Sequence, residues 1–131
     1  MISFTVYGDV AAEARARHSG IRHGRPYTPP NTVAWRLIIR EEAFKHKPDV
    51  LWDGPIGLAI THYKLAPKSA PKRVYNRTKP DVDNIEAMVM NSLKGIIYTD
   101  DCRIVHIETD KLCGDPPRME IGLWQMEEAG A

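Results

Sequence analysis

The chain has 131 residues, of which 43% are hydrophobic and 27% are charged, and its formal net charge at pH 7 is +1. These values are typical of one ordinary globular domain, residues 1–131, which is long enough to bury a core without disulfide bonds. No run reaches the roughly 18 apolar residues of a membrane-spanning helix, and the N-terminal segment MISFTVYGDV does not resemble a signal peptide. We therefore exclude a membrane protein and expect a cytoplasmic one.

The first predicted elements are a strand and a helix. Residues 2–7 alternate apolar and polar side chains, which predicts a half-buried strand. Residues 8–31 have no apolar periodicity and contain several glycines and prolines, which indicates a long loop. Thr32 is expected to cap a helix that runs to about Lys45. The apolar face of this helix is expected to contain Ala34, Leu37, Ile38 and Phe44.

The remaining elements follow in the order strand, helix, strand, strand. Residues 56–65 alternate again, and a proline-punctuated loop follows over residues 65–80. The clearest helix spans residues 84–94, where apolar side chains recur at i, i+3 and i+4 and a glycine follows the last turn. Residues 103–111 and 118–126 predict two further strands. The whole order predicts an α/β or α+β domain, with a small mixed sheet of about four strands and two main helices packed against it.

The cysteines do not form a recognisable metal motif. Cys102 and Cys113 are the two cysteines of the chain, and their spacing matches neither a CxxC pair nor a zinc knuckle. A zinc site made from both cysteines and His106 would lack an obvious fourth ligand. We expect two reduced thiols.

Charge is unevenly distributed along the chain. Residues 64–79 contain six basic side chains and no acid, and residues 14–28 contain four arginines, two histidines and no acid. Five acidic residues lie from Asp81 to Asp101. Basic loops beside an acidic cluster suit a polyanionic substrate that is cut at a metal ion. The alternative is that these are ordinary solvated loops.

Four aspartates flank the second predicted helix. Asp83 followed by Glu86 resembles a capping box, and Asp100 and Asp101 could close the turn after the helix, so caps and turns explain all four. In an extended lead-in, however, Asp81 and Asp83 project to the same side of the chain, about 6–7 Å apart.

The two pairs of aspartates meet if residues 96–101 return along the sheet. Three or four converging carboxylates repel one another unless a cation lies among them. Carboxylate oxygens are ligands for Mg²⁺ or Mn²⁺ rather than for zinc. The residues alone leave two interpretations, a metal site and a set of helix caps and turns.

The segment KPDVDNIEAMVMNSLKGIIYTDDCRIVHIETDK, residues 79–111, resembles the signature of RusA-type Holliday junction resolvases. In that family a D-x-D-N motif opens a helix, and a short strand then ends in a D-D pair. The segment SGIRHGRPYTPPNT, residues 19–32, also resembles the arginine-rich YTP loop before the first helix of the family. The resemblance covers most of the chain. It implies a homodimeric crossover junction endodeoxyribonuclease that cuts branched DNA with Mg²⁺, or with Mn²⁺ as a substitute, in recombination and repair.

The resemblance also implies roles by position. Asp81, Asp83 and Asp101 match the catalytic, metal-binding carboxylates of the family. Asp100 matches the less essential first member of the second pair, which also counts as a metal ligand. Asn84 matches an asparagine that supports the site.

The sequence departs from the family pattern at one position. The family usually carries a lysine four residues after the second aspartate, and this chain has Ala87 there. The sequence does not decide which lysine, if any, replaces it, and the candidates are Lys79, Lys94 and the supporting residue Lys111. Two alternative functions follow from this departure. One is a branched-DNA-binding protein with weakened or lost catalysis, and the other is a nuclease for other branched or flapped DNA.

The basic residues are expected to hold DNA phosphates, which position a duplex without reading its sequence. Those expected to bind DNA are Lys72, Arg73, Arg77, Lys79, Arg22 and Arg25. Tyr75 lies among them and is expected to pack, with stacking on an unpaired base at a junction as the alternative. His62 and His106 lie on predicted strands and are also expected to pack. The three tryptophans are expected in the core or in an interface.

Overall fold

In the computed structural model, which describes residues 1–11 and 30–128, the chain forms four strands and two α-helices. The strands are β1 (Ile2–Tyr7), β2 (Ile56–Lys64), β3 (Ile104–Cys113) and β4 (Arg118–Gln125). The helices are α1 (Pro30–Phe44) and α2 (Val82–Leu93), and a short 3-10 helix, η1 (Asp101–Arg103), precedes β3. This order confirms the predicted order of elements and the α/β fold class, but α1 begins at Pro30, so the prediction that Thr32 caps it is wrong. No helix among these residues is long and apolar enough to span a membrane.

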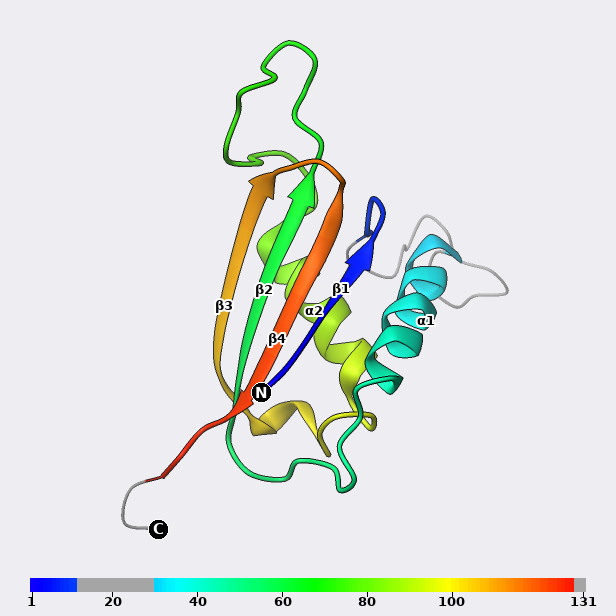
Figure 1. The fold of residues 1–131 in the computed structure, drawn as a ribbon, viewed down its shortest axis with the longest axis vertical. Coiled ribbons are helices and arrows are strands. Elements are labelled where there is room, and N and C mark those ends of the chain that lie inside the picture. The colour runs from blue at the N-terminus through cyan, green and yellow to red at the C-terminus, as the bar shows by residue number, and fades with distance from the viewer. Residues whose placement is uncertain (12–29, 129–131) are drawn as a thin grey trace, which may run out of the picture.

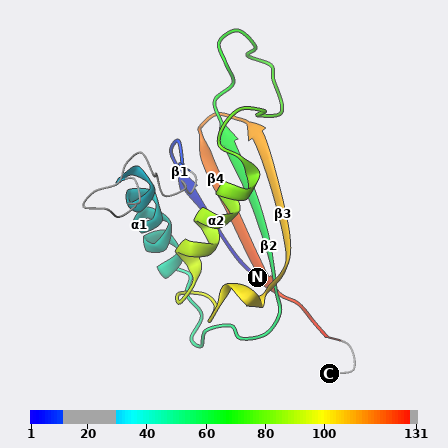
Figure 2. The ribbon, with the colours of Figure 1, turned by 180° about the vertical axis from the view of Figure 1, so that it is seen from behind.

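The four strands form one mixed sheet in the order β1-β4-β2-β3. β4 is antiparallel to both of its neighbours, whereas β2 and β3 are parallel. Parallel neighbours need a crossover connection, and α2 lies in the connection between them. Figures 1 and 2 show α1 and α2 against the same face of the sheet. The fold therefore has two layers, and no helix of the described chain covers the other face.

The core lies between the sheet and the helices. The strand residues that alternation places on the helix side are Phe4, Val6, Leu58, Ile60, Ile121 and Leu123, each at most 7% exposed. From α2 the buried apolar residues are Ile85, Met88, Val89 and Leu93, the stripe predicted from the helical spacing. Ser92 is buried beside them because its hydroxyl donates to the Met88 carbonyl at 2.6 Å.

The apolar face predicted for α1 is wrong. Its four members, Ala34, Leu37, Ile38 and Phe44, are all exposed. The stripe that packs instead runs through Thr32, Trp35, Ile39 and Ala43. Both stripes have the three- or four-residue spacing of a helix, so periodicity alone does not choose between them.

Residues 96–101 do not return along the sheet as the metal hypothesis required. Gly95 has a positive φ of 81° and reverses the chain at the end of α2. Its amide donates to the Tyr98 carbonyl at 2.8 Å. Ile97 and Tyr98 are fully buried next to this turn. Because these apolar side chains bury at the end of the helix, the second aspartate pair remains there.

Candidate functional site

The first aspartate pair lies at the start of α2. Asp81 is the N-cap residue with extended backbone angles, so the helix begins at Val82 and Asp83 lies in its first turn. The prediction that Asp83 caps the helix is therefore wrong, and so is the extended lead-in through both aspartates. Aspartate is a favoured N-cap at either position, so the local signal does not distinguish them. Both side chains are exposed at the positive end of the helix dipole.

The Asp81 side chain does not cap the helix. Its carboxylate accepts hydrogen bonds from the Lys79 ammonium, at 3.0 Å to Oδ2 and 3.2 Å to Oδ1. The Lys79 side chain is 83% exposed and that of Asp81 is 51% exposed. Water screens such a pair, which therefore adds little to the stability of the fold. Both charged groups are accessible to a ligand.

The backbone that leads into α2 is held by two lysines. The Lys111 ammonium donates to the Thr78 carbonyl at 2.6 Å, and the Lys64 ammonium donates to the Lys79 carbonyl at 3.1 Å. The buried Asn76 side chain accepts from the Thr78 amide at 3.1 Å and from its hydroxyl at 2.7 Å. These contacts fix the chain directly before the first aspartate pair. Lys111 thus contacts this backbone and not the aspartate side chains.

Glu86 ties α2 to the sheet and does not complete a capping box. Its carboxylate accepts from the Thr109 hydroxyl on β3 at 2.7 Å, and both residues are half-buried. Asn84, the residue expected to support the site, is half-buried near the same end of α2. The contact with β3 fixes the start of the helix relative to the sheet.

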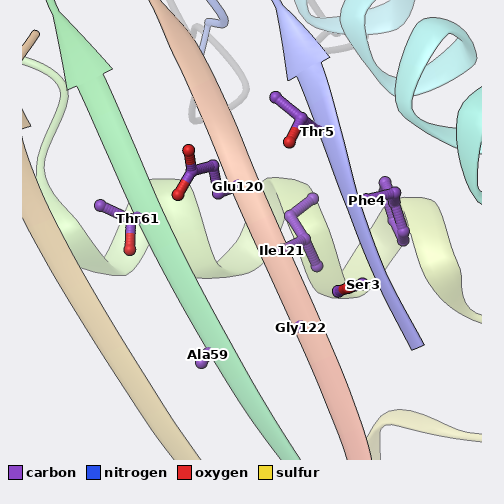
Figure 3. Close-up of a pocket in the computed structure, with 8 residues that line it drawn as sticks. All are labelled: Ser3, Phe4, Thr5, Ala59, Thr61, Glu120, Ile121 and Gly122. Atoms are coloured by element: carbon purple, nitrogen blue, oxygen red, sulfur yellow. The ribbon is translucent and has the colours of Figure 1, made fainter. Parts of the chain in front are cut away.

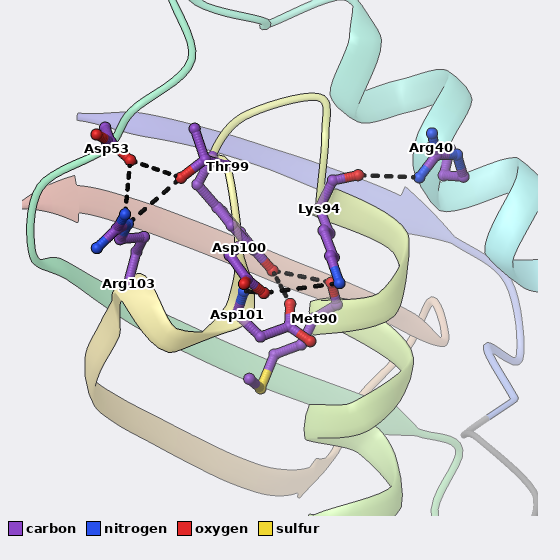
Figure 4. A network of polar contacts seen from close by, with 9 residues as sticks. Arg40, Asp53, Met90, Lys94, Thr99, Asp100, Asp101 and Arg103 are labelled. Atoms are coloured by element: carbon purple, nitrogen blue, oxygen red, sulfur yellow. Dashed lines mark hydrogen bonds and ion pairs between the residues drawn. The ribbon is translucent and has the colours of Figure 1, made fainter.

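The second aspartate pair lies beyond the other end of α2 (Figure 4). One Asp100 oxygen accepts from the Asp101 amide at 2.7 Å and lies 3.6 Å from the Lys94 ammonium. The Tyr98 hydroxyl lies 3.4 Å from an Asp101 oxygen and 2.8 Å from the Met90 carbonyl, so it can donate to either. Burial, and then the charge of Asp101, raise the pKa of Tyr98. The hydroxyl therefore keeps its proton.

Two arginines bind chain segments that lie next to the second aspartate pair. Arg40 of α1 donates to the carbonyls of Ser92 and Lys94 at 3.0 and 3.3 Å and so caps the C-terminal end of α2. Arg103 of η1 forms an ion pair with Asp53 at 3.0 Å (Figure 4). Sequence reasoning missed both arginines, because their partners are distant in the chain.

The length of α2 separates the two aspartate pairs. Its twelve residues span about 18 Å, and Figures 1 and 2 show its ends near opposite ends of the sheet. Among residues 1–11 and 30–128, no three His, Cys, Asp or Glu side chains form a group that could hold a metal ion. One chain thus leaves the two aspartate pairs at opposite ends of α2 and does not bring them together.

Comparison with known proteins identifies the family. Residues 8–123 match the family described as endodeoxyribonuclease RusA. The chain belongs to the RusA family. It is also similar to the uncharacterized protein YqaN of Bacillus subtilis (strain 168), with 31% identity over 133 residues, or 92% of this chain and 93% of YqaN. The match confirms the RusA resemblance seen in the sequence.

Ala87 is the position at which this RusA family member lacks the expected lysine. It lies one helical turn after Asp83, on the same side of α2, and is half-buried. Of the three candidate lysines, Lys79 contacts the first aspartate pair and Lys94 contacts the second. Lys111 is engaged with a backbone carbonyl. The structure therefore places a different lysine beside each pair.

Asp81 and Asp83 at the start of α2 follow directly on the loop of residues 65–80. Figure 1 shows this loop projecting beyond the ends of β2 and β3. Among the residues expected to bind DNA, Lys72, Arg77 and Lys79 are exposed and Arg73 is half-buried. Arg22 and Arg25 lie outside the described residues. The prediction that Tyr75 packs is wrong, because this side chain is 69% exposed.

The two strand histidines lie in different environments. His62 is 1% exposed, as predicted, and its Nε2 lies 2.8 Å from the Val10 carbonyl. Burial lowers the pKa of His62, which favours the neutral ring. His106 is exposed beside Glu108, with 3.0 Å between its Nε2 and the carboxylate, so the prediction that it packs is wrong. His62 belongs to the core and His106 to the surface.

The cysteines and two of the tryptophans behave as predicted. Cys102 and Cys113 are free thiols. Trp35 and Trp52 pack against the core. Trp124 is half-buried and lies over Gly57, where a side chain of any size would collide with its ring.

The uncovered face of the sheet contains a hollow of about 370 Å³ (Figure 3). The residues that face it are Ser3, Thr5, Ala59, Thr61, Glu120 and Gly122, and they alternate along the strands with Phe4 and Ile121 of the core. The Glu120 carboxylate accepts from the Arg118 guanidinium at 3.1 Å. Figure 3 shows α2 behind the strands that carry these residues, so the hollow is separate from the aspartates.

The chemistry of the two aspartate pairs fits a divalent cation of the magnesium type. All four donors are carboxylates, which are the hard oxygen ligands that Mg²⁺ and Mn²⁺ prefer. Asp81 and Asp83 are exposed at the start of α2, and the buried Tyr98 hydroxyl lies within reach of Asp101. The four carboxylates are the type of ligand that Mg²⁺ requires, although one chain does not bring all four together.

Proposed function

We propose that this chain is a Mg²⁺-dependent, structure-selective endodeoxyribonuclease that resolves Holliday junctions by hydrolysing phosphodiester bonds in DNA recombination and repair. Membership of the RusA family supports the nuclease class. The observation that carries the proposal is the exposure of Asp81 and Asp83 at the start of α2, directly after the basic loop 65–80. DNA phosphates held by that loop would lie beside two carboxylates.

Three aspartates are the catalytic residues of this proposal. Asp81, Asp83 and Asp101 would hold one or two metal ions, with Asp100 as a further ligand and Mn²⁺ able to replace Mg²⁺. A bound Mg²⁺ supplies an activated water and stabilises the charge that develops on the leaving oxygen. The contribution of the chain is positional. The Tyr98 hydroxyl would orient Asp101 when it donates to that carboxylate rather than to the Met90 carbonyl, and the contact between α2 and β3 fixes the start of the helix.

The basic residues would hold the DNA through its phosphates. The proposed contacts are those of Lys72, Arg73, Arg77, Lys79, Arg22 and Arg25. Such contacts make affinity fall as salt rises, but they carry no sequence preference. Because the loop of residues 65–80 leads directly into Asp81, DNA phosphates bound by the loop would lie close to the carboxylates of Asp81 and Asp83.

We infer that the active form is a homodimer whose two copies share each site. The proposal needs both aspartate pairs in one site, and α2 holds them about 18 Å apart in a single chain. Two copies related by a two-fold axis, with antiparallel α2 helices, would place Asp81 and Asp83 beside Asp101 of the partner subunit. A four-way junction is itself roughly two-fold symmetric. Such a dimer would present two equivalent sites to two strands.

The test uses a synthetic four-way junction and a linear duplex, each incubated with the protein in Mg²⁺ and in EDTA. We expect paired nicks in the junction that require Mg²⁺, and an intact duplex. Junction binding without Mg²⁺-dependent nicks would instead show a branched-DNA-binding protein that lost catalysis with the lysine absent at Ala87. Cleavage of flapped DNA alone would show a nuclease for other branched structures.

A further inference from the structure

The loop of residues 65–80 exposes two neighbouring apolar side chains. Val74 is 60% exposed and Tyr75 is 69% exposed. Exposed residues of this size are ordinary when they are isolated on a surface. Here they lie side by side in the sequence, within a segment that contains six basic residues and no acid from Lys64 to Lys79. That setting suggests a ligand with both anionic and apolar parts.

The backbone that carries Tyr75 is held against the sheet. The Cys113 amide donates to the Val74 carbonyl at 2.7 Å, and the Asn76 amide donates to the Lys111 carbonyl at 3.1 Å. Tyr75 itself forms an antiparallel bridge with Leu112 on β3. Val74–Asn76 is therefore a short strand-like segment on the edge of the sheet.

The next residue strengthens this anchor. Asn76 is 7% exposed, and its side chain accepts two hydrogen bonds from Thr78. The backbone on the C-terminal side of Tyr75 is thus fixed as well. A ligand that contacts the tyrosine ring would not have to order this segment first, which lowers the entropic cost of binding.

The charges around Tyr75 suit a nucleic acid strand. Arg73 and Arg77 lie two residues away on either side, and Lys72 and Lys79 follow at greater separations. Cations hold phosphates, whereas an aromatic ring stacks on the face of a base. In a linear duplex the base faces are covered by their neighbours. At a branch point they can be uncovered, so an exposed ring beside phosphate-binding cations favours branched DNA.

We propose that Tyr75 stacks on an unpaired base at the branch point of a DNA substrate and thereby favours branched over linear DNA. The proposal rests on the proposed function for the class of substrate. Base–aromatic stacking is worth about tenfold in affinity or more for each base. Tyr75 is thus a specificity-determining residue that is separate from the catalytic aspartates.

Binding measurements in EDTA test the stacking without any cleavage. The variants are Tyr75→Ala and Tyr75→Phe, with Tyr7→Ala as the control because Tyr7 is similarly exposed, at 67%, on β1. We expect Tyr75→Ala to weaken binding to a four-way junction about tenfold and to leave duplex binding unchanged. Tyr75→Phe keeps the ring and should bind like the wild type, as should Tyr7→Ala. Thermal melting checks that each variant is folded.

A fluorescent base analogue at the branch point gives a second readout. With 2-aminopurine there, the wild type and Tyr75→Phe should change the fluorescence in the same direction and to a similar extent, and Tyr75→Ala should produce a smaller change. Equal losses of junction and duplex binding in Tyr75→Ala would overturn the proposal, as would no loss at all. A wild type without preference for junctions would overturn it too. Junction binding without nicks would contradict only the proposed nuclease, because this experiment needs no catalysis.

Discussion

Lys79 is the lysine best placed to supply the charge that Ala87 lacks. Its ammonium lies 3.0 and 3.2 Å from the two oxygens of Asp81 and is largely exposed. The ammonium of Lys111 is bound to a backbone carbonyl, and that of Lys94 lies at the other end of α2. An exposed cation beside a proposed catalytic carboxylate could contact the phosphate under attack. Positioned charges of that kind stabilise the transition state.

Lys79→Ala should therefore lower the single-turnover rate of junction cleavage about tenfold or more at saturating protein. Adding Ala87→Lys to that variant should restore part of the rate. A lysine at this position lies one turn from Asp83 and leans toward the start of the helix. Arg77→Ala is the matched control, because it should weaken DNA binding and leave the saturated rate nearly unchanged. A double variant no faster than Lys79→Ala would refute this role.

Arg40 is the residue that joins α1 to the end of α2. It donates two hydrogen bonds to the carbonyls at that end. Its positive charge also interacts favourably with the negative end of the helix dipole. Arg40→Ala should lower the free energy of unfolding by about 1–2 kcal/mol. Lys45→Ala, at an exposed ion pair on the same stretch of chain, should leave it unchanged. Urea denaturation of the three proteins compares these values, and equal midpoints for all of them would exclude the capping role.

The elements differ in how far their sequences determine them. The strands and α2 were predictable because each has one apolar stripe with a clear period. α1 has two stripes, and only packing against β1 and α2 selects the one that contains Ile39 and Ala43. Residues 96–98 are apolar enough to form a strand, but the positive φ at Gly95 and burial under the helix end hold them in a turn. The buried stripe of α1 and the conformation of residues 96–98 depend on tertiary contacts, which a local sequence pattern does not reveal.

The shared site can be tested at the level of the whole molecule by mixing inactive variants. Asp81→Asn and Asp101→Asn should each abolish cleavage while retaining junction binding in EDTA, since loss of a negative charge does not weaken phosphate contacts. In a mixed dimer, one site would carry both substitutions and the other would carry neither. We therefore expect the mixture to nick one strand of the junction. An inactive mixture, with subunit exchange confirmed by mass spectrometry, would argue against shared sites.

Part of the candidate site was predictable from the sequence. The four aspartates were found by residue type and spacing, and their association with a basic loop was evident from charge. The separation of the two pairs was not predictable, because it depends on α2 and on the turn at Gly95. The sequence does not choose among the three candidate lysines, because their partners depend on the fold: Lys79 contacts Asp81, Lys94 contacts Asp100 and Lys111 contacts a backbone carbonyl.

In the proposed homodimer, the length of α2 would also set a distance on the DNA. If each end of the helix belongs to a different catalytic centre, α2 is a rigid spacer between the two cuts. Its twelve residues would hold the centres about 18 Å apart, and each added turn would widen the gap by about 5.4 Å. The separation of the two cleaved phosphates would then follow from the number of residues in a single helix.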